Sequence, residues 1–402
     1  MIEIRPARPE EFPAVLSPIM HYFGRSPGPE FAERFGPMLP ADRIHVAFED
    51  GEIVGSGGAF PFEIGVPGGL ARAAGTTLVG VLPTHRRRGI LRGLMRAQLD
   101  DVRERGEPLA YLWASQDAIY GRFGFGVASF TGTIDLPGER IAFWRDFEPA
   151  GRIRLLDVDE ALEAFPPLQR RAAEQHPGMF VRTPEWWQNR RLADPEPGRE
   201  GGGEMNRAIL ELDGEAAAYA LYRLHFSADR GIPTGFTSVI EAVGISPVAT
   251  LEIWRYLLEI DWMASIRAHL LPLDHELLLL VREPRRLRLN YRDGLWVRVV
   301  DVEAAMNART FGAGEPVVIE LADEFCAWNQ GVWELGPDGA ARSSAAPELR
   351  LDAPALGSAY LGGFTFAQLA RAGRLEELAE GALARADDLF RTDRYPWCPE
   401  IF

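Results

Sequence analysis

VGVLPTHRRRGILRGL, the segment Val79–Leu94, carries the most information about the fold. An apolar, strand-like segment ends at Pro83, three arginines and Gly89 follow, and a helical pattern then begins. The free N–H groups of a first helical turn, the helix dipole and the arginine side chains all favour a negatively charged group. We therefore expect a phosphate-binding turn between a strand and a helix, formed by Arg86, Arg87, Arg88, Gly89 and Ile90.

This turn lacks the signatures of common nucleotide-binding proteins. No Walker lysine and no G-x-G-x-x-G motif follows, so nucleoside triphosphates and nicotinamide dinucleotides are poor candidates. Short basic turns also occur by chance, and a solvated helix start without a ligand is the alternative interpretation. The spacing Arg86-x-x-Gly89 resembles the pyrophosphate loop of GNAT acetyltransferases, which bind coenzyme A there. Leu91 departs from that family, which usually has a small residue at this position.

A second motif follows the strand-like segment Tyr111–Ser115. It reads QDAIYGRFGFG and places Tyr120 a few residues ahead of Gly124–Phe125. In GNAT enzymes, a tyrosine ahead of a Gly-Phe pair follows the strand that separates from its neighbour to admit the cofactor. The resemblance therefore implies a catalytic Tyr120. The alternative is a packing residue whose hydroxyl finds an ordinary hydrogen-bond partner.

The two motifs together, in a chain of 402 residues, resemble the Eis (enhanced intracellular survival) family of N-acetyltransferases. The resemblance implies a mixed α/β (α+β) fold, with tandem GNAT-like domains followed by a sterol-carrier-protein-like α/β domain. The domains are expected at residues 1–150, 151–288 and 289–402, and only the first has the cofactor motif. The resemblance also implies an acetyl-CoA-dependent enzyme that acetylates multi-amine substrates such as aminoglycosides, and a homohexamer built as a dimer of trimers.

Amide formation from a thioester requires a neutral amine, a polarised carbonyl group and a proton for the departing thiolate. A thiol titrates near ~8.5 and a tyrosine near ~10, so Tyr120 is the candidate general acid. Backbone N–H groups of the strand at Val79 and Val81 are candidates to polarise the carbonyl group. Ser115 is a further candidate cofactor-binding residue.

The resemblance assigns the base to the terminal carboxylate, which belongs here to Phe402. A disordered terminus is the alternative, but an aromatic-rich tail (RYPWCPEIF) predicts a packed segment. The candidate substrate-binding residues are Thr77, Leu78 and Glu400. His21, Phe23 and Phe31 are further candidates, although core packing explains the two phenylalanines better.

Composition limits the partners. The net charge of −15 disfavours nucleic acid and suits a cationic small-molecule amine, although acidity also simply keeps a protein soluble. The chain contains no lysine, and its seven histidines show no metal-ligand spacing, so no metal is expected. No run approaches the ~20 apolar residues of a membrane span, and the N-terminus is no signal peptide. Cys326 and Cys398 are expected to be reduced thiols in the cytoplasm.

Local patterns place several elements. Asp50–Gly51 and Asp213–Gly214 each separate two strand-like segments and predict two-residue hairpin turns. The recurrence of this arrangement predicts that the second domain duplicates the first without its arginine turn. Apolar residues at helical spacing after Gly89 predict a helix that buries one face, and Val297–Val302 is expected as a strand of the third domain.

Three functions remain open at this stage. The first is acetylation of multi-amine compounds. The second keeps the acetyltransferase activity with a protein lysine or a small arylalkylamine as acceptor. The third is a non-enzymatic scaffold that binds acyl-CoA or lipid through the third domain.

Overall fold

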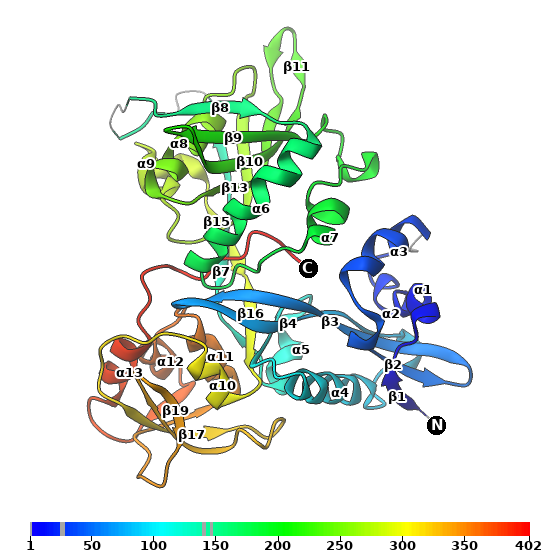
Figure 1. The fold of residues 1–402 in the computed structure, drawn as a ribbon, viewed down its shortest axis with the longest axis vertical. Helices are drawn as coiled ribbons and strands as arrows, with labels where there is room; N and C mark the ends of the chain where they lie inside the picture. Colours follow the sequence, from blue (N-terminus) through cyan, green and yellow to red (C-terminus); the bar gives the residue numbers. More distant parts are fainter. Residues whose placement is uncertain (1, 25–28, 139–141, 145–147) are drawn as a thin grey trace. The chain divides into compact units, whose positions relative to one another are not determined.

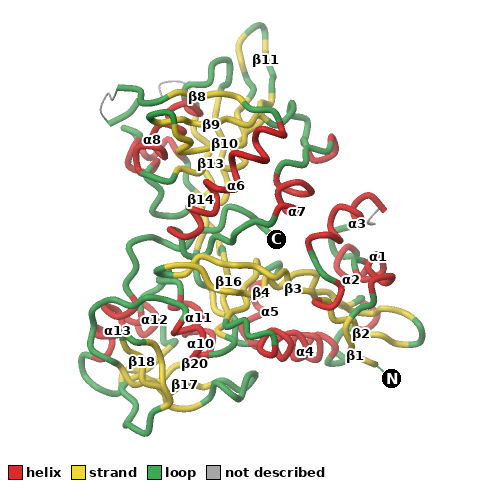
Figure 2. Tube along the Cα trace, viewed as in Figure 1, coloured by secondary structure: helices red, strands yellow, loops and turns green. Residues whose placement is uncertain are grey.

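The computed structural model describes residues 2–24, 29–138, 142–144 and 148–402 (Figure 1). The chain divides into two compact units, and each combines segments that lie far apart in the sequence. The first unit contains residues 1–129, 294–396 and 401–402, and the second contains residues 130–293 and 397–400. Figure 2 shows that each unit mixes helices and strands, which confirms the expected mixed α/β class.

A seven-stranded sheet forms the first part of the first unit. Its strand order is β1 (Glu3–Pro6), β2 (Ile44–Glu49), β3 (Glu52–Val66), β4 (Gly69–Val81), β5 (Leu109–Trp113), β16 (Leu295–Val299) and β6 (Gly126–Val127). Glu49 pairs with Glu52, and Asp50 and Gly51 both have positive φ, so the predicted two-residue turn is confirmed. The strand expected at Val297–Val302 forms over Leu295–Val299 as β16. Its expected place with the other strands of the third domain is wrong, because β16 pairs with β5 and β6 in this sheet.

Helix α4 (Ile90–Glu104) covers one face of this sheet, as the helical spacing predicted (Figure 1). Its buried residues Met95 and Leu99 pack with Ala110 and Leu112 of β5. Two short helices also pack against the sheet. Helix α1 (Phe12–Val15) contacts β3 and the neighbouring helix α3 (Pro29–Phe35), and helix α2 (Ser17–Met20) contacts β3 and β4. Side chains of a strand alternate between faces, so Tyr111 points away from α4.

A second sheet forms the second unit. Its order is β15 (Asn290–Asp293), β7 (Phe130–Pro137), β14 (Ser265–Leu271), β13 (Phe236–Gly244), β10 (Glu215–His225), β9 (Asn206–Leu212) and β8 (Arg152–Leu155). Leu212 pairs with Glu215 across Asp213–Gly214, which confirms the second hairpin. The chain thus enters this sheet at β7, within the range expected for the first domain, and the domain boundaries stay a prediction.

Two longer helices cover opposite faces of the second sheet. Residues of α8 (Pro247–Leu258) pack with Ala218, Ala220 and Tyr222 of β10. Phe165 of α6 (Val158–Gln175) stacks on Tyr219, whose side chain points to the other face. Further short elements of this unit are α7 (Pro184–Trp186), η6 (Trp187–Arg191), α9 (Leu277–Leu280), β11 (Ala228–Asp229) and β12 (Ile232–Pro233).

The C-terminal part of the first unit has a sheet of its own. Its order is β19 (Gly339–Arg342), β18 (Gly331–Gly336), β17 (Val317–Ala322), β20 (Leu349–Asp352) and β21 (Leu375–Glu377). Its helices are α10 (Val302–Asn307), α11 (Ala353–Tyr360), α12 (Phe366–Arg371) and α13 (Ala382–Phe390). Among the helices in the described ranges, none combines the length and the apolar composition that crossing a bilayer requires.

Candidate active site

The central feature of the first sheet is the early end of the pairing between its parallel strands. Strands β4 and β5 pair only from Ala73–Leu109 to Gly75–Tyr111, although β4 continues to Val81. The far edge of β4 beyond Gly75 therefore has no strand partner in the described chain. Unpaired N–H groups of an edge strand can bind a ligand by β-type hydrogen bonds. This segment contains all the strand residues expected at the site, which are Thr77, Leu78, Val79 and Val81.

A bulge shapes this segment at Leu78. Its φ is 54°, and the pairing of β3 with β4 shifts register between Ser56 and Gly58. The Ser56 hydroxyl donates a hydrogen bond of 3.0 Å to the Leu78 carbonyl oxygen and holds the bulge. Positive φ at a leucine is costly, and such conformations concentrate at functional positions. The bulge changes which backbone groups of the strand point toward its unpaired edge.

The arginine turn follows directly. Gly89 is the N-cap of α4 with φ of 79°, and no side chain caps this helix N-terminus. Arg86 and Arg87 are exposed, and no hydrogen bond or ion pair involves either side chain in the described part of the molecule. Free N–H groups at a helix start next to unpaired arginines suit a phosphate group. Arg88 differs, because it donates to both carboxylate oxygens of Glu49, at 2.8 and 2.6 Å.

Tyr120 ends the short helix α5 (Asp117–Tyr120) and is 5% exposed. It packs in the cluster that contains Ala110, Leu112 and Met95, so it lies on the α4 face of the sheet. Burial raises the pKa of Tyr120, and a hydrogen bond with Ser115 offsets part of that effect. The phenol therefore stays protonated throughout the neutral pH range.

Phe402 lies on the other face. Its ring centroid is 4.9 Å from that of Tyr111 and 5.4 Å from that of Phe62. A Cβ on Gly75 would lie 3.3 Å from Cε2 of Phe402, so the ring packs against the last paired residues of β4 and β5. The residue expected to supply the base and Tyr120 thus lie on opposite faces, at the place where the two strands separate.

The other candidate residues fall in different places. His21 contacts Tyr22, whose hydroxyl donates to the Val81 carbonyl oxygen at 2.6 Å. Phe23 is 57% exposed, so the core interpretation of this residue is wrong. Phe31 stacks on Phe35, which in turn contacts Phe60.

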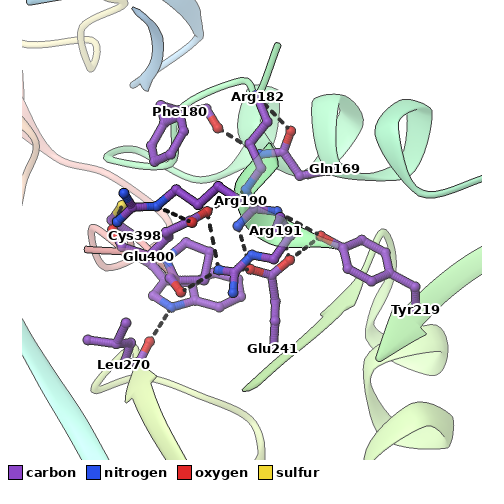
Figure 3. Close-up of polar contacts among 12 residues, drawn as sticks. Gln169, Phe180, Arg182, Arg190, Arg191, Tyr219, Glu241, Leu270, Cys398 and Glu400 are labelled. Carbon is purple, nitrogen blue, oxygen red and sulfur yellow. Dashed lines mark hydrogen bonds and ion pairs between the residues drawn. The ribbon is translucent and has the colours of Figure 1, made fainter. Parts of the chain in front are cut away.

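Glu400 belongs to a buried cluster in the second unit (Figure 3). Its carboxylate accepts from Arg182 Nε at 2.7 Å and Arg190 Nε at 3.2 Å, and lies 3.3 Å from Arg191. Burial alone would raise the pKa of Glu400, but these arginines hold it at about 2. The carboxylate is ionised and paired with arginines, and the substrate-binding role expected for Glu400 stays a prediction. Nothing in the local sequence signals this cluster, because its members come from distant segments.

The second unit repeats the strand separation without the arginine turn. Its parallel pair, β13 and β14, is joined only from Phe236–Ser265 to Val239–Ala268. Helix α8 then begins at Pro247 with Ser246 as its capped N-terminus, and no arginine lies between β13 and α8. The predicted duplication without a cofactor motif agrees with this geometry. In the described ranges, no group of three or more His, Cys, Asp or Glu side chains is arranged to hold a metal.

Comparison with known proteins defines the family. Acetyltransferase (GNAT) domain models match residues 3–128 and 178–299, and a sterol carrier protein domain model matches residues 302–399. N-acetyltransferase Eis of Mycobacterium tuberculosis is 33% identical over 383 residues, which cover 91% of each chain. The chain belongs to the Eis family of N-acetyltransferases.

Two further comparisons agree. The crystal structure of Eis1 from Mycobacterium abscessus covers both chains fully at 32% identity, with a TM-score of 0.88. An uncharacterized N-acetyltransferase of Streptomyces coelicolor is 39% identical over the full length of both chains. The molecule is thus an acyltransferase with two GNAT domains and a C-terminal sterol-carrier-like domain, and GNAT acetyltransferases use acetyl-CoA.

The lowered pKa of Glu400 predicts a pH dependence of stability. A folded-state pKa of about 2 against 4.5 for the free side chain means that Glu400 stabilises the fold above pH 4.5. This contribution, about 3 kcal/mol, is lost as the pH falls from 4.5 to 2. The free energy of unfolding of wild type minus that of Glu400→Gln should therefore shrink over this range in urea titrations. Parallel pH profiles of the two proteins would contradict the ion pairing of Glu400.

Proposed function

We propose that this enzyme transfers the acetyl group of acetyl-CoA to amino groups of multi-amine compounds, aminoglycosides among them. The observation that carries the proposal is the placement of Tyr120 and Phe402 on opposite faces, where β4 and β5 separate. A thioester held along the unpaired edge of β4 would have its sulfur on the Tyr120 side. Its carbonyl carbon would be open to attack from the Phe402 side.

The turn after β4 is proposed to hold the pyrophosphate of the cofactor. Arg86 and Arg87 supply unpaired guanidinium groups, and the N–H groups of Gly89 and Ile90 begin an uncapped helix. Arg88 is proposed to act through Glu49, which fixes the turn to the end of β2. Val79 and Val81 are the proposed strand partners of the pantetheine arm and Ser115 a further cofactor contact, while Thr77 and Leu78 are proposed to face the acceptor.

The chemistry follows from these positions. The amine nitrogen attacks the thioester carbonyl carbon, and the Phe402 carboxylate takes the proton that the nitrogen loses. Backbone N–H groups of β4 stabilise the oxyanion. The carbon–sulfur bond then breaks, and the Tyr120 hydroxyl gives its proton to the thiolate of coenzyme A. Solvent returns a proton to the phenolate and removes one from the carboxyl group.

The acceptor class rests on charge and on the named relatives. A net charge of −15 attracts polycations, and Eis proteins are N-acetyltransferases. A small arylalkylamine is the second candidate, because the rings of Phe60, Phe62 and Tyr111 surround that of Phe402. The homohexamer stays a prediction of the family resemblance.

Thiol release with an amine panel tests the proposal. The panel contains an aminoglycoside, an arylalkylamine and a lysine-containing protein, and mass spectrometry locates each acetyl group. Because the enzyme has no lysine, any acetyl-lysine must come from the added protein. We expect acetylated aminoglycoside. Acetyl-CoA binding without turnover on any amine would instead support a scaffold.

Arg86→Ala should raise the KM for acetyl-CoA roughly ten- to hundredfold, because a charge-assisted hydrogen bond to phosphate contributes about 1.5–3 kcal/mol. Arg88→Ala should raise it less, and Glu49→Gln should reproduce that smaller effect. The matched control is Arg371→Ala, which removes an exposed arginine from α12. An unchanged KM in Arg86→Ala would remove the phosphate-binding role of the turn.

Tyr120→Phe should lower kcat by about 10²–10⁴-fold while the KM for acetyl-CoA changes little, because only the proton donor is lost. Since burial raises the pKa of Tyr120 above 10, the wild-type kcat should show no loss from ionisation of this phenol at neutral pH. Tyr360→Phe is the control, because it removes a buried hydroxyl that bonds the Ala305 carbonyl oxygen in the same unit. A kcat within twofold of wild type would make Tyr120 a packing residue.

One glycine appended after Phe402 moves the terminal charge by up to ~3.6 Å, more than a hydrogen-bond length. Turnover should then collapse while acetyl-CoA affinity, measured by calorimetry, stays as in wild type. Amidating the native terminus should have the same effect without added bulk. Full kcat in a C-terminally tagged enzyme would refute the base role of the Phe402 carboxylate.

A further inference from the structure

The second unit binds the segment Trp397–Glu400 through groups that lie beyond the last paired residues of β13 and β14. Strand pairing ends at Val239 and Ala268, and the cluster uses Glu241 of β13 and Leu270 of β14. In the first unit, the same position of the sheet is the unpaired edge of β4 proposed for the cofactor. The C-terminal segment of the chain is therefore bound, in the second unit, next to the end of strand pairing, through Arg182 and the Glu241 side chain and through the Leu270 carbonyl oxygen.

Arg182 is the centre of this cluster (Figure 3). Its side chain is 1% exposed, and its two terminal nitrogens donate to the Glu241 carboxylate at 2.8 and 2.5 Å. The remaining donor, Nε, binds Glu400 at 2.7 Å. One guanidinium group thus joins strand β13 to the C-terminal segment, and Gln169 of α6 fixes its backbone by accepting from the Arg182 N–H.

Charge makes Glu400 necessary in this cluster. Arg182, Arg190 and Arg191 face two carboxylates, those of Glu241 and Glu400, and the Tyr219 hydroxyl donates to Glu241. Without Glu400, Arg182 and Arg191 would share Glu241 as their one remaining ion-pair partner in the described part of the chain. Buried charge without a partner is strongly unfavourable, so the cluster favours the bound segment.

Backbone and aromatic contacts add to the ionic ones. The backbone N–H of Trp397 donates to the Pro177 carbonyl oxygen at 2.7 Å. The indole N–H of Trp397 donates to the Leu270 carbonyl oxygen at 2.5 Å. Arg191 also donates to the Pro399 carbonyl oxygen, at 3.1 Å. The segment is therefore recognised along its length, by main-chain and side-chain groups together.

We propose that the second GNAT domain is a receptor for the C-terminal segment and that Arg182, through Glu400, is a positioning residue for the terminal carboxylate. Only Ile401 separates Glu400 from Phe402, so fixing Glu400 limits the reach of that carboxylate to about 7 Å along the chain. This inference rests on the proposed function for its catalytic consequence. Capture of the segment is a separate claim with its own measurement.

Two variants test capture by different means. Glu400→Gln removes the charge that Arg182 binds, and Trp397→Phe removes the hydrogen bond to Leu270 together with part of a buried ring. Trp254→Phe is the matched control, because Trp254 is 1% exposed in the same unit and its indole N–H has no hydrogen-bond partner in the described structure. Carboxypeptidase A, which removes C-terminal aromatic residues, reports release of Phe402 by mass spectrometry.

We expect Phe402 to be removed at least tenfold faster from Glu400→Gln and Trp397→Phe than from wild type and Trp254→Phe. The kcat should fall by up to about 10²-fold in the first two variants, because small misplacements of a reacting group have effects of this size. Their KM for acetyl-CoA should stay within twofold, which a general loss of folding would not allow.

Equal rates of Phe402 release from wild type and the three variants would overturn the proposal that the second domain binds the C-terminal segment, whatever their acetyltransferase activity. Faster release with unchanged kcat would overturn the positioning role. Wild type that protects Phe402 yet acetylates no amine would overturn the proposed function and leave the receptor intact.

Discussion

The separation of β4 from β5 beyond Gly75 is the constraint on which the rest of the first unit depends. Parallel strands normally continue pairing until one of them ends, and unpaired backbone groups inside a protein are costly. Here the pairing stops while β4 continues for six residues, from Thr76 to Val81. The bulge at Leu78, held by Ser56, and the helix start at Gly89 lie along this continuation. In the proposed function, their backbone N–H groups face the extended cofactor.

The same separation divides the proposed chemistry between two faces. Tyr120 belongs to the packed layer beneath α4, where burial keeps its phenol protonated. Phe402 belongs to the aromatic layer on the other side. A donor and a base placed on opposite sides cannot neutralise each other directly. An acyl group between them can lose its thiolate toward one face and accept an amine from the other.

Gene duplication gives a simple account of the second unit. Its parallel strands β13 and β14 also stop pairing early, as β4 and β5 do in the first unit. No arginine turn lies between β13 and α8. The second unit instead has the buried cluster of Arg182, Glu241 and Glu400, which joins β13 to the C-terminal segment.

The sequence predicted those structural features that residues close together in the chain determine. The Asp-Gly turns, the helix after Gly89 and the packed aromatic tail are local patterns, and the structure agrees with each of them. The sequence could not predict that β16 joins the first sheet, because no local sequence pattern specifies which distant strands pair. The cluster of Arg182, Glu241 and Glu400 could not be predicted for the same reason, because Arg182 and Glu400 are separated by 218 positions in the sequence. The sequence predicted a substrate-binding role for Glu400, and its ion pairs with Arg182, Arg190 and Arg191 were not foreseen.

The most direct test of the account is the number of coenzyme A molecules that one chain binds. Isothermal titration calorimetry on the 402-residue protein measures it without any assumption about the acceptor. The account predicts one molecule per chain, because no arginine turn lies between β13 and α8 in the second domain. Two molecules per chain, or none, would contradict it.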